Sequence, residues 1–284
     1  AVYSGMSRKE VINTFKVASE SNCKFLYVSP ERLESTLFKE YLPGLGVNLI
    51  AVDEAHCISQ WGYDFRPPYL RIAALREELP HVTMLALTAS ATPEVQKDIC
   101  EKLEFQNHQI FRQSFERANL SYSVFKVDSK INKIIEVLRK VNGTSIVYCK
   151  SRKRTKELSE LLQLQQISSD YYHAGLAQEE RSKRQEAWIN NKTRVIVCTN
   201  AFGMGIDKPD VRTVIHADVP DCLENYYQEA GRGGRDGKTS YAVLLYDDRD
   251  IHELEKLADL RFPSLEDIRN VYQSIANYLQ IPFG

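Results

Sequence analysis

The sequence has no long apolar run, no closely spaced pair of cysteines and almost no net charge. No apolar stretch approaches the ~18 residues that a membrane-spanning helix needs, so we expect no membrane segment. The six cysteines include no C-x-x-C pair, which excludes the common zinc spacings and favours reduced thiols in a cytoplasmic protein. Because the formal net charge is −1, binding to nucleic acid would require local basic surface rather than bulk charge.

A phosphate-binding loop is also missing. The pattern G-x-x-x-x-G-K-[ST] is approached only at Gly237-Lys238-Thr239, but Arg232 stands where its first glycine belongs, and the segment precedes an apolar run instead of following one. We therefore interpret this stretch as an ordinary loop. The sequence starts at Ala1 without a methionine or a helix start, as if cut from a longer domain, so we expect a phosphate-binding loop before it.

Short apolar runs alternate with amphipathic stretches along the chain. Such runs, bounded by polar residues, are typical of strands buried on both faces, and their alternation with helices predicts parallel sheets covered by helices. The chain is therefore predicted to have an α/β fold. The expected strands are 24–28, 48–52, 84–87, 145–148, 194–198, 214–216 and 241–245, and the clearest expected helices between them are 152–165 and 178–190.

The length of 284 residues suits about two domains of roughly 100–200 residues each. We expect the boundary near residues 115–125, because an incomplete α/β pattern ends there and a complete one begins. The expected division is a first, partial domain at 1–120, a second domain at 121–250, and the start of a helical region at 251–284, with helices at 253–260 and 265–279.

Two carboxylates follow the apolar run that ends at Val52. Asp53 and Glu54 would lie at the carboxyl end of a parallel strand, which is where such sheets bind their ligands. Asp53 could hold Mg²⁺ through water, and Glu54 could orient or deprotonate an attacking water. The alternative is an acidic turn on the surface.

A loop rich in aromatic residues, from Gln60 to Tyr69, comes directly afterwards. Its rings and its arginine could stack on splayed bases, or they could be buried against their own domain. Small hydroxyl residues follow the apolar run at 84–87, namely Thr88, Ser90 and Thr92. They could hydrogen-bond the carboxylates, or they could simply cap a helix.

Arginines and glycines come together at 231–235. The glycines would allow a close approach to phosphate, and the planar fork of arginine pairs two phosphate oxygens; the alternative is a solvated loop. Polar residues that could contact phosphate also follow the expected strands at 145–148 and 194–198, and one lies in the segment 172–176. A helix start with basic residues favours anions, whereas a solvated basic face and an ordinary turn are the alternatives. The polar residues are Ser151, Arg152, His173, Thr199 and Asn200. The glycine-rich turn at 203–207 fits a linker between a nucleic-acid contact and a nucleotide contact.

The order of these motifs resembles the RecQ family of superfamily 2 DNA helicases, over roughly residues 1–250. The most specific part is the acidic motif joined to the aromatic-rich loop, Asp53-Glu54-Ala55-His56-Cys57-Ile58-Ser59-Gln60-Trp61-Gly62 with Asp64-Phe65-Arg66-Pro67. Other superfamily 2 helicases carry the acids without that loop. Further segments of the sequence resemble other motifs of the family, namely 88–92, 146–152, 172–176, 198–210 and 227–237.

The resemblance implies two RecA-like lobes that bind ATP and Mg²⁺ between them, with single-stranded DNA crossing both lobes and movement from 3′ to 5′. It implies that Asp53 holds Mg²⁺ through water, that Glu54 activates the attacking water, and that Arg235 is the arginine finger. The other implied nucleotide contacts are Gly205, Asp207, Gln228 and Arg232. The implied coupling residues are His56, Thr88, Ser90 and Thr92, and the implied DNA contacts are Trp61, Phe65, Arg66, Ser151, Arg152, His173, Thr199 and Asn200.

Members of the family often carry a four-cysteine zinc module after the second lobe, but the segment after Asp250 has no cysteine, so no zinc site is expected in this chain. The intact protein is expected to be an ATP-dependent helicase on single-stranded and forked DNA, a monomer, and cytoplasmic (nucleoid-associated if bacterial). The alternatives are a DNA-binding scaffold fragment and a double-strand DNA translocase. Because the phosphate-binding loop is missing, we expect negligible ATPase activity from these residues alone.

Overall fold

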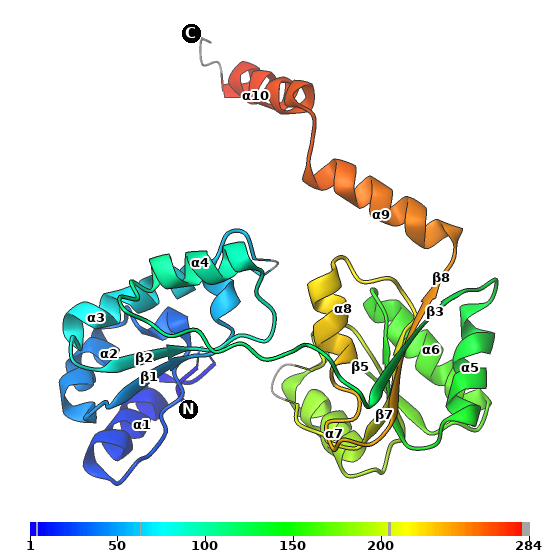
Figure 1. The fold of residues 1–284 in the computed structure, drawn as a ribbon, viewed down its shortest axis with the longest axis horizontal. Coiled ribbons are helices and arrows are strands. Elements are labelled where there is room, and N and C mark those ends of the chain that lie inside the picture. The colour runs from blue at the N-terminus through cyan, green and yellow to red at the C-terminus, as the bar shows by residue number, and fades with distance from the viewer. Residues whose placement is uncertain (4, 63, 204–205, 280–284) are drawn as a thin grey trace. The chain divides into compact units, whose positions relative to one another are not determined.

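The computed structural model describes residues 1–3, 5–62, 64–203 and 206–279, and its contacts divide the chain into two units, Ala1–Ser114 and Phe115–Gly284 (Figure 1). Both units are α/β, and the strand pairs within the described residues are parallel, which confirms the predicted fold class. None of the helices in these ranges combines the length and the apolar character that crossing a membrane requires.

The first unit contains a sheet of two parallel strands, β1 (Leu49–Val52) and β2 (Thr83–Ala86). Ser7 and Glu10 form a capping box that starts the first helix, and Thr92 caps the last one. The helices are α1 (Arg8–Glu20), α2 (Thr36–Tyr41), α3 (Leu75–Glu78) and α4 (Pro93–Lys102), with short 3-10 helices η1 (Pro30–Arg32), η2 (Leu42–Leu45), η3 (Ala55–Ile58) and η4 (Pro67–Ala74).

One face of this two-stranded sheet builds the core of the first unit. Val52 and Met84 are buried there together with Val95 from α4. On the opposite face, Leu49 and Leu85 remain 53% and 41% exposed, because no described element packs closely enough to cover them. The prediction that these strands are buried on both faces is therefore wrong for the first unit.

The prediction of a strand at 24–28 is also wrong. Val28 makes a single parallel bridge, to Val2, and the segment continues no further as a ladder. Phe25 and Tyr27 are 79% and 71% exposed. The apolar residues here pair with one short stretch of chain instead of entering a sheet, so the hydrophobic run does not become a buried strand.

The second unit is built on a six-stranded sheet with the order β3-β8-β7-β4-β6-β5. Four of these strands match expected apolar runs, but the strands at 120–126 and 169–172 were missed. Their sequences mix serine, tyrosine, aspartate and lysine with few apolar residues, so they lack a continuous apolar run. The strands are β3 (Leu120–Lys126), β4 (Thr144–Tyr148), β5 (Ser169–Tyr172), β6 (Val195–Cys198), β7 (Val211–His216) and β8 (Ser240–Tyr246).

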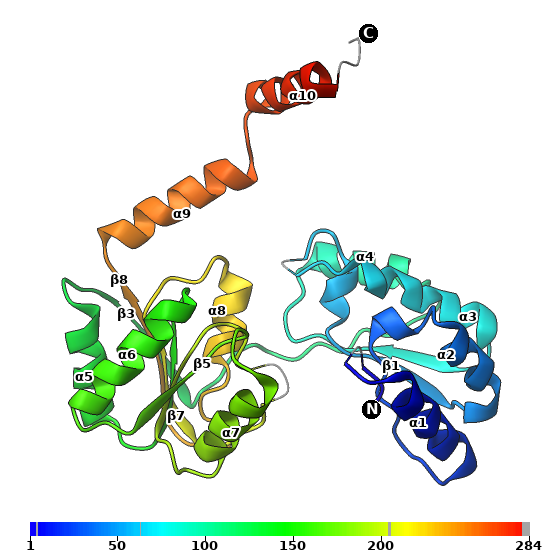
Figure 2. The same ribbon diagram turned by 180° about the vertical axis from the view of Figure 1, so that it is seen from behind.

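Helices cover both faces of this sheet (Figure 1 and Figure 2). Leu138 of α5 (Lys130–Lys140) and Leu162 of α6 (Arg152–Leu164) pack with Val147 on one face. Trp188 of α7 (Gln178–Ile189) packs with Ile146 on the other, where α8 (Leu223–Ala230) also lies. Strands β4 and β6 are buried throughout, so the predicted burial on both faces is confirmed for these two strands.

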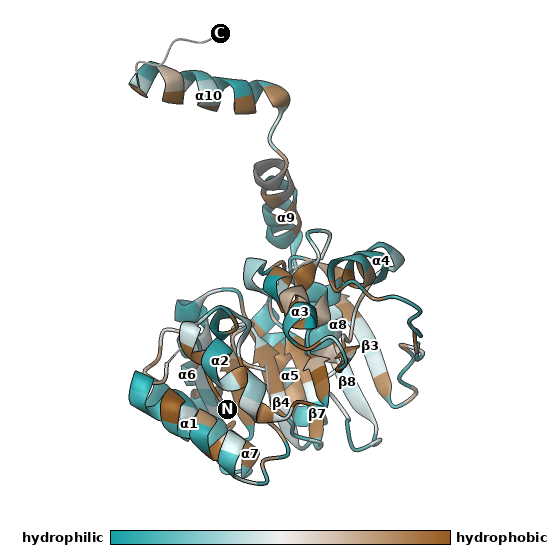
Figure 3. Cartoon of the chain, turned by 90° about the vertical axis from the view of Figure 1, so that its left-hand side faces the viewer, coloured by the Kyte–Doolittle hydropathy of each residue, from teal (hydrophilic) through white to brown (hydrophobic). Residues whose placement is uncertain are grey.

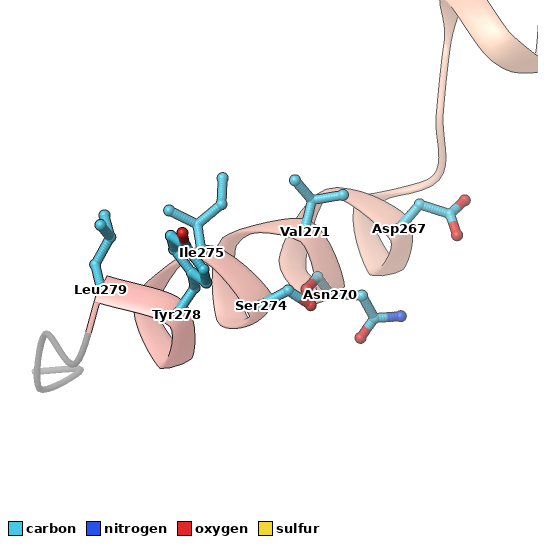
Figure 4. Close-up of a pocket in the computed structure, with 7 residues that line it drawn as sticks. All are labelled: Asp267, Asn270, Val271, Ser274, Ile275, Tyr278 and Leu279. Atoms are coloured by element: carbon cyan, nitrogen blue, oxygen red, sulfur yellow. Dashed lines mark hydrogen bonds between the residues drawn. The ribbon is translucent and has the colours of Figure 1, made fainter.

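Two helices end the described chain, α9 (Asp248–Arg261) and α10 (Leu265–Leu279), as expected for this region. Helix α10 carries both polar and apolar segments along its length (Figure 3). A shallow, open hollow lies on it, and its lining comes from this helix alone, so it is one face of a helix rather than a ligand pocket. The lining residues are Asp267, Asn270, Val271, Ser274, Ile275, Tyr278 and Leu279 (Figure 4).

Candidate functional site

The two acidic residues lie where strand β1 ends, at the carboxyl edge of the sheet in the first unit. Asp53 is exposed, and its Oδ1 accepts the backbone N–H of Glu54 at 2.9 Å. Glu54 adopts a left-handed backbone conformation with φ 50° and ψ 41°, which costs a residue other than glycine about 1–2 kcal/mol. Strain of this kind is retained where the surrounding structure imposes it, and functional sites are common examples.

His56 connects the acidic motif to the end of the neighbouring strand. Its Nδ1 lies 3.4 Å from Oε2 of Glu54 and 3.0 Å from Oγ1 of Thr88, which follows β2. The side chain is buried, and this burial lowers the pKa of His56 more than the nearby Asp64 raises it. The imidazole therefore lies between the carboxylate and the hydroxyl, in surroundings that favour its neutral form.

The other two residues expected to couple the nucleotide to DNA have different surroundings. Ser90 is buried within the segment that follows β2. Thr92 caps α4, and its Oγ1 accepts the backbone N–H of Val95 at 3.4 Å. Of the four residues, the structure thus brings His56 and Thr88 into direct contact and gives Thr92 the capping position that the sequence had left open as an alternative.

The aromatic-rich loop folds back onto η3 and presents its tryptophan outward. Trp61 is 80% exposed, while its backbone N–H donates to Oγ of Ser59 at 3.2 Å. A Cβ atom on Gly62 would lie 2.7 Å from the carbonyl oxygen of His56, so only glycine fits this close approach. The loop is therefore held by its backbone at a fixed distance from His56.

Asp64 and Arg66 form a partly exposed ion pair in the same loop. Oδ2 of Asp64 accepts from Nε and Nη2 of Arg66 at 3.1 and 2.6 Å. The thiol of Cys57 lies 3.8 Å from the same oxygen, and burial followed by Asp64 raises the pKa of Cys57 to about 12. Phe65 is half-buried. Cys57 is thus a neutral thiol against a carboxylate that is already paired with an arginine.

In the second unit, the two expected nucleotide-binding arginines both reach the glycine-rich turn. Nη1 of Arg232 donates to the carbonyl of Gly203 at 2.5 Å, and its Nε is buried without a hydrogen-bond partner in the part of the chain that the structure describes. Nη1 of Arg235 lies 3.1 Å from Oδ1 of Asp207. Gln228 lies on α8, one turn before Arg232. Gly205, the remaining expected contact, lies outside the described residues.

The expected phosphate contacts of the second unit gather at the carboxyl ends of three adjacent strands. In the ladders, Tyr172 and Tyr148 each pair with Cys198, so the residues that follow β5, β4 and β6 are neighbours. They include His173, which follows β5, the helix start at 151–152, which follows β4, and the exposed residue Asn200 after β6.

Arg152 and His173 lie near each other, on either side of Gly175. A Cβ atom on Gly175 would lie 3.0 Å from Nη1 of Arg152 and 3.3 Å from Nδ1 of His173. Burial, followed by the positive charge of Arg152, lowers the pKa of His173. Ser151 caps α6 by accepting the backbone N–H of Arg154, and Thr199 is buried at the end of β6. The arrangement is a partly basic strand edge with one partly buried imidazole.

Three residues that the sequence did not single out hold the arginine-bearing segment in place. Arg117 donates to the carbonyls of Gly231, Gly233 and Gly234 at 3.3, 3.0 and 3.0 Å. His216 of β7 is fully buried, and its Nε2 lies 2.9 Å from Oε2 of Glu229 on α8. The contacts of Arg117 join positions more than a hundred residues apart, and no local sequence pattern marks any of these contacts.

Comparisons with known proteins define the class. The family described as DEAD/DEAH box helicase matches residues 1–99, and the family described as Helicase conserved C-terminal domain matches residues 129–237. The solved structure of the Mycobacterium smegmatis helicase Lhr bound to ssDNA and AMP-PNP has a TM-score of 0.66 at 20% identity, over 86% of this chain and 34% of that one. S. cerevisiae Dbp5 bound to RNA and ADP BeF3 has a TM-score of 0.59 at 18% identity, over 79% and 60%. Fold and motifs together define a superfamily 2 helicase with RecA-like units.

Relatives in sequence then identify the family within this class of helicases. The ATP-dependent DNA helicase RecQ of Bacillus subtilis is 44% identical over 252 residues, covering 88% of this chain and 43% of the relative. The RecQ-like DNA helicase BLM of Xenopus laevis is 42% identical over 271 residues, covering 92% and 19%. The chain belongs to the RecQ family of DNA helicases, and it spans less than half the length of these two relatives.

Proposed function

We propose that this chain supplies the ATP-driven motor of a RecQ-type DNA helicase, which moves from 3′ to 5′ on single-stranded DNA and separates forked duplex. The observation that carries the proposal is the contact of His56 with both Glu54 and Thr88, at 3.4 and 3.0 Å, in the segment that leads into the aromatic-rich loop. This contact supports a direct mechanical connection between a hydrolytic carboxylate and a loop that faces DNA.

The carboxyl edge of the first unit fits a hydrated Mg²⁺ ion. Asp53 is an exposed carboxylate, and Mg²⁺ prefers one or two carboxylates together with water and phosphate oxygens. Bound Mg²⁺ and ATP would supply the phosphoryl group whose hydrolysis drives the motor. Glu54 would orient the attacking water and accept its proton, and the neutral His56 would fix the position of that carboxylate.

The second unit offers cationic groups for the triphosphate. The buried Nε of Arg232 has a donor to spare within the described structure, and Arg235 is held by an exposed ion pair with Asp207 and by a hydrogen bond of 3.3 Å to the carbonyl of Ile206. Such a pair contributes little in water, so Arg235 can exchange Asp207 for phosphate. We assign Arg235 as the arginine finger, a role worth about 10³–10⁵ in rate where it is known. Gln228, Asp207 and Gly205 would complete the nucleotide contacts.

The DNA contacts would be of two kinds. In the first unit, the exposed Trp61 together with Phe65 and Arg66 would stack on or sense the bases. In the second unit, the strand edge would bind the phosphate backbone, because its arginine and polar groups suit anions. The residues of that edge are Ser151, Arg152, His173, Thr199 and Asn200.

Replacing Glu54 by glutamine in the full-length protein tests the hydrolytic part of this proposal. A general base contributes about 10²–10⁴ in rate, so DNA-stimulated ATP hydrolysis should fall by at least that range while nucleotide binding persists. Glu20→Gln, an exposed site at the end of α1, is the matched control and should retain activity. Unchanged turnover in Glu54→Gln would remove this carboxylate from the mechanism.

A DNA-binding scaffold is the second candidate for these residues taken alone. It is supported by the sequence, in which the 284 residues contain no G-x-x-x-x-G-K-[ST] pattern to cradle phosphates. We expect the isolated chain to bind single-stranded DNA without hydrolysing ATP, and DNA-stimulated hydrolysis by it would contradict this. A double-strand translocase would be stimulated by blunt duplex as strongly as by forked DNA, whereas an exposed base-stacking loop favours the fork.

A further inference from the structure

Three side chains with different ligand chemistry converge beneath the aromatic-rich loop. They are an imidazole and a thiol from η3, His56 and Cys57, and the carboxylate of Asp64 from the loop. Their ligand atoms all lie within 4.8 Å of one another. His56 and Cys57 are 2% and 1% exposed, so the group is enclosed on the protein side.

The distances from the thiol approach those around a tetrahedral zinc ion. With a Zn–S bond of about 2.3 Å and Zn–N or Zn–O bonds of about 2.0–2.2 Å, sulfur lies about 3.5 Å from each neighbouring ligand atom. Here Sγ of Cys57 lies 3.7 Å from Nε2 of His56 and 3.8 Å from Oδ2 of Asp64. Each of these two distances exceeds the zinc value by a few tenths of an ångström, and the imidazole nitrogen and the carboxylate oxygen lie within 4.8 Å of each other, so modest side-chain shifts would bring the three ligand atoms around a common centre.

The second nitrogen of the histidine has the support that a metal ligand needs. In metal sites, the ring nitrogen that does not bind metal donates to an oxygen, which fixes the tautomer and the ring orientation. Nδ1 of His56 lies 3.0 Å from Oγ1 of Thr88 and 3.4 Å from the carboxylate of Glu54. With the proton on Nδ1, the lone pair of Nε2 points toward Cys57.

We propose that His56, Cys57 and Asp64 bind one thiophilic divalent cation of the zinc class, with water as the fourth ligand. On binding, the thiol proton of Cys57 leaves to solvent and the thiolate, the neutral imidazole and the carboxylate form the bonds to the metal. The site is distinct from the hydrated Mg²⁺ expected at Asp53, because a thiolate selects zinc-like ions and Mg²⁺ selects oxygen. It escapes a search for paired cysteines, since its ligands are one cysteine, the preceding histidine and an aspartate seven residues on.

Occupancy would change the loop that faces DNA. The metal would take Oδ2 of Asp64 away from Arg66 and would tie the loop to η3 through Cys57. This consequence rests on the proposed helicase function, in which Arg66 and His56 connect DNA to hydrolysis. Zinc should accordingly inhibit DNA-stimulated ATP hydrolysis by the full-length protein, and Cys57→Ser should be less sensitive to it.

Cobalt titration of this chain tests the binding directly and requires no ATPase activity. We expect one equivalent of Co²⁺ to produce a thiolate charge-transfer band that Zn²⁺ abolishes and excess Mg²⁺ does not. Cys57→Ser should lose the band, and Cys23→Ser, at an exposed cysteine, should keep it. Thr88→Val, at an exposed position, should keep the band and weaken affinity roughly 10–100-fold, as removal of an outer hydrogen-bond partner does.

Each part of the inference has its own contradicting result. Absence of the band in the native chain, or an unchanged titration in Cys57→Ser, would overturn the site. If cobalt binds as expected but zinc inhibits native and Cys57→Ser protein equally, the regulatory consequence fails while the site stands. A protein that binds cobalt yet never hydrolyses ATP would refute the proposed function and leave the site intact.

Discussion

Truncation of Trp61 to alanine separates a DNA-binding role of the aromatic-rich loop from a structural one. The indole is 80% exposed, so its removal takes little buried area from the first unit, and surface substitutions of this kind change stability by about 0.5 kcal/mol or less. If the ring stacks on a base, its loss costs roughly 1–3 kcal/mol of binding. At about 1.4 kcal/mol per tenfold change, affinity for single-stranded DNA should fall roughly 5- to 150-fold.

Fluorescence anisotropy with a labelled single-stranded oligonucleotide, at one fixed salt concentration, measures this change in the full-length protein. Phe25→Ala is the matched control, because Phe25 is an aromatic residue of the same unit that is 79% exposed. It should bind as the native protein does, and both variants should retain the native melting temperature. Equal affinities for Trp61→Ala and native protein, or an equal loss in Phe25→Ala, would refute base stacking by this loop.

Three further predictions concern the supports of the site. Gly62→Ala forces a Cβ to within 2.7 Å of the His56 carbonyl, so the loop must move, and calorimetry should show a destabilisation of about 1–3 kcal/mol together with weaker DNA stimulation of ATPase. Arg117→Lys loses a fork that spans three carbonyls, and denaturant unfolding should show a loss of roughly 1–3 kcal/mol. NMR titration should give His173 a pKa below its ordinary 6.5, and Arg152→Ala should raise that pKa toward it.

The sign of the histidine effect on stability follows from the direction of its pKa shift. A folded-state pKa below 6.5 means that the unfolded chain binds the proton more readily. The contribution of His173 to stability is therefore present above about pH 6.5 and is lost as the pH falls through the lower, folded-state pKa. If the stability of the second unit rises on acidification through this range, the lowered pKa of His173 is contradicted. An unchanged unfolding curve for Gly62→Ala or for Arg117→Lys would contradict the corresponding prediction for that variant.

The second unit was more predictable from sequence than the first, for a physical reason. Strands β4 and β6 lie inside a sheet covered on both faces, and they contain the uninterrupted apolar runs 146–148 and 195–198. Strand β3 needs no such run, since its burial pattern leaves most of its residues exposed. In the first unit, the apolar run at 24–28 led to a wrong strand prediction. Apolar residues indicate that a segment can be buried, but they do not specify which strand it pairs with.

In the candidate site, too, some features were predictable from the sequence and others were not. That Asp53, Glu54 and Thr88 share one edge follows from parallel strands, whose carboxyl ends lie side by side. The position of His56 between a carboxylate and a hydroxyl does not follow, because it depends on the left-handed turn at Glu54. The support of the glycine loop by Arg117 depends on tertiary packing, and no spacing rule connects residues more than a hundred positions apart.

Strand separation by the full-length protein tests the central claim most directly. A duplex with a 3′ single-stranded tail and a duplex with a 5′ tail are incubated with ATP and Mg²⁺, and the displaced strand is measured for the native protein and for Glu54→Gln. The account predicts that native protein unwinds the 3′-tailed duplex in preference to the 5′-tailed one, and that Glu54→Gln binds both and unwinds neither. Unwinding by Glu54→Gln at the native rate, or a preference for the 5′ tail, would contradict it.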